Sequence, residues 1–141
     1  MLISTKGRYA LRMMVDIAMY CGDGYVTLKD ISARQDISVK YLEQVAALLC
    51  RAGLLQSLRG SSGGYRLAKA PQAYTAGDIL RAAEGTLAPI ACLQTESNAC
   101  VRCAECTTIS FWEGFYRTIE TYVDGITLQD LLLQAREKEQ A

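Results

Sequence analysis

The chain of 141 residues has no histidine, only two prolines and two phenylalanines, and no apolar run of membrane-spanning length. Without imidazole, Ser-His-Asp and Cys-His catalysis are excluded, and so is any zinc site that needs a histidine ligand. No nucleophile–base pair can be drawn from the other residues, so we do not expect an enzyme. The N-terminus lacks the apolar segment of a signal peptide, and a cytoplasmic location is expected.

Net charge is also absent from the chain as a whole, but not from its halves. Residues 1–70 carry ten Lys and Arg against five acidic residues, whereas residues 71–141 carry five against ten. A basic half suits binding to a polyanion, and an acidic half suits a different task. We therefore predict a DNA-binding domain over 1–70 and a second region over 71–141.

Cysteine, by contrast, is concentrated. Four of the six cysteines lie in fifteen residues with the spacing C-x7-C-x2-C-x2-C, at Cys92, Cys100, Cys103 and Cys106. Thiolates spaced in this way can converge on one centre, and soft sulfur suits zinc or an iron–sulfur cluster. The overlapping C-x2-C pairs are closer to ferredoxins than to zinc knuckles, so we favour a cluster over zinc and over free or disulfide-bonded thiols. Cys21 and Cys50 instead follow apolar helix stripes and are expected in the core.

The basic half has the pattern of a helix-turn-helix followed by a β-wing. Apolar periodicity predicts a helix over 6–21, and Thr27 and Ser38 are expected to cap two further helices joined by a turn at 35–37. The third helix should bury Val39, Leu42, Val45, Ala46 and Leu49. Its opposite face and the following hairpin, with a Gly/Ser tip at 60–64, are expected to contact DNA, although an ordinary solvated helix face has the same pattern. The candidate DNA-binding residues are Ser38, Lys40, Tyr41, Glu43, Gln44, Arg51, Arg59, Gly60 and Arg66.

The acidic half should place the cysteine loop between two helices. Thr75 is expected to cap the first, and Thr107 or Thr108 the second, a long helix over 107–126. Apolar residues step by three and four along that helix, at Trp112, Phe115, Tyr116, Ile119, Tyr122, Val123 and Ile126. An exposed seam of this size predicts a homodimer, and the alternative is that the helix folds back on the first one. A last helix should start at Thr127, and residues 135–141 are expected to fray.

Residues 4–10, 37–44, 59–67 and 89–92, together with Trp112 and residues 127–131, resemble the IscR-like iron–sulfur cluster regulators, dimeric winged-helix transcription factors of bacteria. The resemblance covers nearly the whole chain. It implies a mainly α fold with a small β-wing and a long dimerisation helix, and operator DNA as the partner. It also implies that an iron–sulfur cluster controls DNA binding, with 2Fe–2S favoured over 4Fe–4S.

The resemblance further assigns ligands. In the family three cysteines and a histidine hold the cluster, and a Trp follows the last cysteine by six residues. Trp112 has that spacing from Cys106, so Cys92, Cys100 and Cys106 take the cysteine positions, whereas Ile109 stands where the histidine would be and cannot ligate.

Other family positions differ as well. Some relatives recruit a ligand near the partner's first helix, but Arg8 and Arg12 stand there. Cys103 is additional to the family pattern and is the predicted fourth ligand, and Glu43 is the residue expected to discriminate between operators. The alternatives are a winged-helix regulator that uses the same thiols for structural zinc or for oxidant sensing, and a small iron–sulfur electron carrier.

Overall fold

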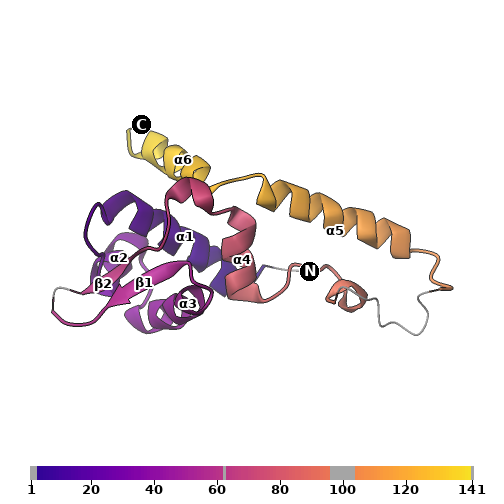
Figure 1. Ribbon diagram of the computed structural model, residues 1–141, viewed down its shortest axis with the longest axis horizontal. Helices are drawn as coiled ribbons and strands as arrows, with labels where there is room; N and C mark the ends of the chain where they lie inside the picture. Colours follow the sequence, from indigo (N-terminus) through magenta and orange to yellow (C-terminus); the bar gives the residue numbers. More distant parts are fainter. Residues whose placement is uncertain (1–2, 62, 96–103, 141) are drawn as a thin grey trace.

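The computed structural model describes residues 3–61, 63–95 and 104–140, and it combines a helical core, a β-hairpin and one long projecting helix (Figure 1). This confirms the predicted mainly α fold with a small β-wing. The elements in chain order are α1 (Thr5–Tyr20), α2 (Leu28–Gln35), α3 (Val39–Arg51), β1 (Leu55–Leu58), β2 (Gly64–Leu67), the 3-10 helix η1 (Pro71–Ala73), α4 (Ala76–Glu84), the 3-10 helix η2 (Ala91–Leu93), α5 (Ile109–Asp124) and α6 (Leu128–Gln140).

Local capping chemistry sets the limits of the helix-turn-helix. The hydroxyl of Thr27 accepts from the backbone N–H of Asp30 at 3.1 Å and starts α2, and the hydroxyl of Ser38 accepts from the N–H of Tyr41 at 3.1 Å and starts α3. Between them, Asp36 adopts the left-handed conformation with φ of 54° and ends α2. Both predicted caps are confirmed, and the turn lies where the sequence placed it.

The inward face of α3 is buried as predicted, with one exception. Leu42, Val45, Ala46 and Leu49 are fully enclosed. Val39 was expected on the same stripe, but it is 39% exposed. It occupies the first helical position, so this end of the stripe does not reach the core.

Two adjacent glycines allow the hairpin to close against the rest of the domain. Strands β1 and β2 pair antiparallel, from Leu55 opposite Leu67 to Leu58 opposite Gly64. Tyr65 also exchanges two backbone hydrogen bonds of 2.8 Å with Val26. A Cβ atom on Gly64 would overlap the carbonyl oxygen of Val26, and its φ of +145° disfavours other residues. A Cβ atom on Gly63 would likewise overlap the carbonyl oxygen of Leu58, so close backbone contact requires both glycines.

Helix α1 lies at the centre of the core and contacts α2, α3, α4 and α6. Its buried face includes one charged residue, Asp16, which accepts from Arg34 at 2.7 and 2.9 Å and from Gln35 at 3.0 Å. At the end of α1, the hydroxyl of Tyr20 donates to Glu139 at 2.6 Å. The final segment, expected to fray from residue 135, is instead helical to Gln140, because α6 packs against α1 and this hydrogen bond ties its last turns.

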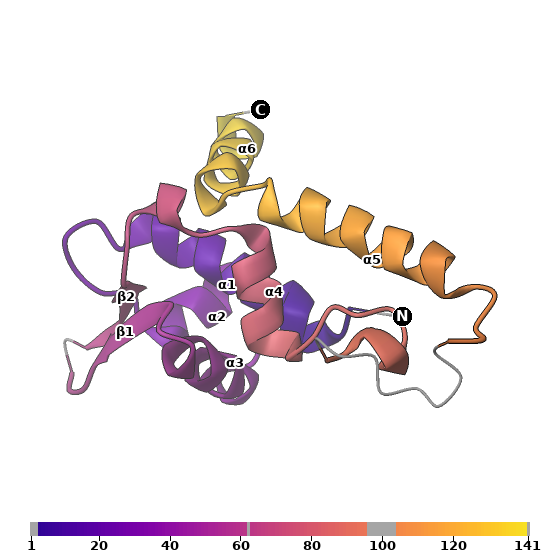
Figure 2. The same ribbon diagram turned by 45° about the vertical axis from the view of Figure 1, so that its right-hand side comes forward.

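Helix α5 projects beyond the core (Figure 2), and none of its side chains is fully buried. The alternative that it folds back along α1 is not observed among the described residues. Thr108 occupies the N-cap position, but its side chain makes no capping bond, contrary to the predicted cap, and lies 3.7 Å from the sulfur of Cys106. At the other end, Asp124 accepts from Arg81 of α4 at 2.8 and 2.9 Å, which fixes α5 to α4.

Candidate functional site

The outer face of α3 presents a mixed polar surface. Ser38, Lys40, Glu43, Gln44 and Arg51 are all exposed. Tyr41 differs from them because it is half-buried, with its ring edge-on to that of Tyr9 at 5.3 Å. A helix face with Gln, Lys and Glu side chains can contact base edges in a major groove, and Arg and Ser can contact phosphates.

The three candidate DNA-binding residues of the wing lie in two places, at the tip of the hairpin and along its second strand. Arg59 and Gly60 lie exposed at the tip. Arg66 does not extend outward in the same way: its Nε donates to Gln56 at 2.9 Å, and its guanidinium lies 4.9 Å from the ring of Tyr25. Both contacts hold Arg66 along the strands, and its DNA contact stays a prediction.

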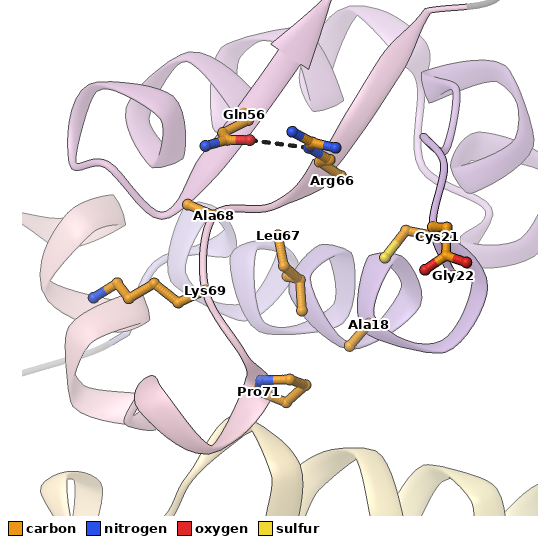
Figure 3. A pocket seen from close by; sticks show the side chains of 10 residues that line it. Ala18, Cys21, Gly22, Gln56, Arg66, Leu67, Ala68, Lys69 and Pro71 are labelled. Atoms are coloured by element: carbon orange, nitrogen blue, oxygen red, sulfur yellow. Dashed lines mark hydrogen bonds between the residues drawn. The ribbon is translucent and has the colours of Figure 1, made fainter.

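Arg66 lines a pocket of about 540 Å³ between the end of α1 and the hairpin (Figure 3). Cys21 and Lys69 also line it. Cys21 and Cys50 were expected in the core; both are partly buried and pack against it. Burial raises the pKa of the Cys50 thiol, which disfavours the reactive thiolate.

The cysteine loop begins and ends beside α5. Cys92 lies in η2 and lines a pocket of about 420 Å³ with Glu113, Tyr116 and Glu120 of α5. Cys106 lies three residues before α5 begins. Cys100 and Cys103 lie outside the described residues. Within the described residues, no three Cys, Asp or Glu side chains are grouped to hold a metal ion.

The donor chemistry of this region fits a soft metal centre. The loop supplies thiols and no imidazole, and Ile109, the first residue of α5, offers no ligand. Sequence reasoning missed the carboxylates of Glu113 and Glu120, which line the Cys92 pocket. The signal was available, because residues 113, 116 and 120 share one helix face by their spacing, but the apolar seam dominated that helix.

Trp112 belongs to an aromatic cluster rather than to a core. Its ring lies 5.0 Å from that of Phe111 and 5.9 Å from that of Phe115, both in edge-to-face geometry. Phe111 is 63% exposed, Phe115 43% and Tyr122 70%. None of the helices formed by the described residues combines the length and apolar character needed to span a lipid bilayer.

Comparison with known proteins identifies regulators. A family model named Rrf2, described as an iron-dependent transcriptional regulator, matches residues 3–134. The transcriptional regulator IscR of Aliivibrio salmonicida is 38% identical over 133 residues, which is 94% of this chain and 78% of that protein. The transcriptional regulator CymR of Bacillus subtilis is 40% identical over 131 residues, which is 93% of this chain and 89% of that protein.

Solved structures of IscR and CymR also superpose on this chain. The structure of T. potens IscR superposes with a TM-score of 0.78 at 40% identity, covering 100% of this chain and 93% of that one. The structure of CymR, described as the global cysteine regulator of B. subtilis, superposes with a TM-score of 0.76 at 36% identity, covering 95% of this chain and 98% of that one.

Proposed function

Because this chain belongs to the Rrf2 family and is a DNA-binding transcriptional regulator, we propose that an iron–sulfur cluster held by its cysteine loop controls which operators it binds. Its relatives are named as regulators, not as enzymes. The observation that carries the proposal is a loop with four thiols and no imidazole, next to the helix that projects from a winged helix-turn-helix domain.

DNA is read by the outer face of α3 and the tip of the wing. Lys40, Gln44 and Glu43 face outward, where they can contact base edges in a major groove. Arg59 extends from the hairpin tip, where it can reach a minor groove. Glu43 sets the choice between operators, because a carboxylate accepts from cytosine but is repelled by phosphate.

The working unit is a homodimer that pairs through α5. The exposed aromatic side chains of this helix form an apolar surface that a second copy would cover. A two-fold dimer would present two copies of α3 to successive major-groove faces of a pseudo-palindromic operator, about 34 Å apart for half-sites one turn apart.

Cys92, Cys100, Cys103 and Cys106 would hold the cluster, with 2Fe–2S favoured over 4Fe–4S. Soft thiolates suit iron and sulfide, and the thiols stay reduced in the cytoplasm, where the protein is expected to act. The bound cluster makes the state of the loop depend on iron supply and redox conditions. The cluster-bound and cluster-free loops can shift α3 toward its DNA-binding position only if one of them stabilises that position more than the other does.

Anaerobic purification tests the proposal. Brown protein that contains iron and sulfide, and binds DNA differently with and without the cluster, is expected. Replacement of each loop cysteine by Ser should alter the cluster, and Cys21→Ser serves as the matched control because Cys21 packs against the core. If Cys103→Ser leaves the cluster spectrum unchanged, the fourth ligand is assigned wrongly.

In a second candidate function, the same thiols bind zinc or react directly with oxidants. The relatives allow for a signal other than a cluster, because they include CymR, described as a cysteine regulator, as well as IscR. Colourless protein with one zinc ion, or metal-free protein whose DNA binding changes when its thiols are oxidised, would favour this candidate. A steep dependence of DNA binding on salt would separate either regulator from a small electron carrier.

A further inference from the structure

The N-terminus of α1 is held by a carboxylate that is distant in the sequence. One oxygen of Glu84, Oε1, accepts from the backbone N–H of Ser4 at 2.8 Å, from its hydroxyl at 2.6 Å and from the N–H of Gly7 at 3.1 Å. Helix α1 has no side-chain cap of its own and no acidic residue in its first turn. Glu84 therefore supplies the negative charge and the acceptor that a helix N-terminus normally obtains locally.

Gly7 makes room for this contact. A Cβ atom at this position would lie 2.5 Å from Oε1 of Glu84 and 2.8 Å from a side-chain carbon of Ile3. Any larger residue would push the carboxylate away from the first turn of α1. The pairing of Gly7 with Glu84 is thus specific in shape as well as in charge.

The same end of α1 contacts both helices of the helix-turn-helix. The ring of Tyr9 packs edge-on against that of Tyr41 in α3 at 5.3 Å. Arg12 lies 5.3 Å from the ring of Tyr9, and it donates to the side-chain oxygen of Gln35 at 3.1 Å and to the carbonyl of Gln35 at the end of α2. A shift of this end of α1 would therefore move the side chains against which α2 and α3 are set.

Glu84 also adjoins the cysteine loop. It is the last residue of α4, Gly85 ends that helix with φ of +85°, and Cys92 follows eight residues after Glu84. One turn earlier, Arg81 binds Asp124 at the end of α5. Helix α4 thus packs against α1 and leads directly into the segment that carries the loop (Figure 2).

From these contacts we propose that Glu84 is the positioning residue through which the state of the cysteine loop reaches α3. The inference deepens the proposed function and rests on it. A loop whose thiols are held together fixes the chain that leaves α4, and Glu84 transfers that constraint to Ser4 and Gly7. Tyr9 then transfers it from α1 to Tyr41 in α3. The contacts along this route need to carry only the coupling free energy, which is the difference in DNA-binding free energy between the two states of the loop.

Four variants test the route. Glu84→Ala removes the acceptor, whereas Glu84→Gln keeps an oxygen that can accept the same hydrogen bonds. Gly7→Ala displaces the carboxylate without changing any charge, and it serves if Glu84→Ala folds poorly. Asp130→Ala is the matched control, because Asp130 accepts from the backbone N–H of Thr127 at 2.9 Å and caps α6, which is not on the route.

Two measurements are made on each full-length variant, with the loop unloaded and after anaerobic loading with ferrous iron and sulfide. The first is the dissociation constant for a duplex operator selected from a random library with the wild-type protein. The second is amide hydrogen exchange over residues 4–12. A coupling of ordinary size separates the two dissociation constants by about 5- to 150-fold.

For Glu84→Ala and Gly7→Ala we expect the two dissociation constants to become equal, and hydrogen exchange over residues 4–12 to stop responding to loading. Glu84→Gln should restore most of the response, and Asp130→Ala should retain it. If Glu84→Ala keeps the wild-type ratio, the inference is overturned while the proposed function stands. If the wild-type protein itself binds DNA equally well in both states, the proposed function fails, and the inference falls with it.

Discussion

Two ion pairs in this protein have similar bond lengths but differ in the burial of the carboxylate, and this allows a sharp prediction. Arg34 binds Asp16 at 2.7 and 2.9 Å, and Arg81 binds Asp124 at 2.8 and 2.9 Å. The two arginine side chains are 32% and 31% exposed. The carboxylates differ, because the side chain of Asp16 is 0% exposed and that of Asp124 is 41% exposed. Replacing each aspartate by asparagine keeps the shape and removes the charge.

The structure fixes what Asp16→Asn would lose. One carboxylate oxygen accepts from Arg34 Nε and from Gln35, and the other accepts from Arg34 Nη2. An amide oxygen can replace the first, but its NH₂ group would then face the Nη2 donor in a site closed to water. The variant thus loses one charge-assisted hydrogen bond and sets two N–H donors against each other. We therefore expect its free energy of unfolding to fall by about 2–3 kcal/mol. For Asp124→Asn, where water reaches the carboxylate, about 0.2–1 kcal/mol is expected.

Urea unfolding followed by circular dichroism measures both free energies of unfolding. All samples should have the same protein concentration, because association shifts apparent stability. Equal losses for the two variants, or a loss below about 1 kcal/mol for Asp16→Asn, would refute the argument that burial of the carboxylate decides the contribution of the pair.

Three further predictions use other features. Phe115→Glu should convert the proposed dimer to a monomer in analytical ultracentrifugation, because a charge would enter the exposed apolar face of α5; an unchanged dimer would place the interface elsewhere. Burial raises the pKa of the Cys50 thiol, so in metal-free protein at about pH 8 iodoacetamide should modify Cys50 more slowly than the loop cysteines, as measured by mass spectrometry. The hydrogen bonds from Arg81 hold the pKa of Asp124 below its usual 3.8. The small stabilisation by Asp124 should therefore be complete above about pH 4 and should be lost at lower pH, so the difference between wild type and Asp124→Asn should shrink in acid unfolding curves.

Much of the fold could be predicted because its signals are local. Thr27, Ser38 and Thr75 each cap a helix whose start is set within three residues, and the glycine-rich tip requires a hairpin. What the sequence could not show depends on tertiary contacts. The contact of Glu84 with Ser4 spans 80 positions, and the order of the last turns of α6 depends on Tyr20 in α1.

The candidate site was predicted less evenly. Most of the outer face of α3 follows from helical periodicity, because burial on one side implies exposure on the other. The position of the Arg66 side chain could not be predicted in this way, because it is set by contacts with Gln56 and Tyr25, which lie in different parts of the chain. The ligand set stays a prediction, since Cys100 and Cys103 lie outside the described residues.

The bare aromatic face of α5 bears on how this regulator should be assayed. In the proposed dimer, assembly and operator recognition are linked, so each drives the other by mass action. Titrations at nanomolar protein would then give sigmoidal curves whose midpoint reports self-association as much as affinity for the site. Within a cell, the same linkage would turn a modest change in regulator abundance into a sharper change in promoter occupancy.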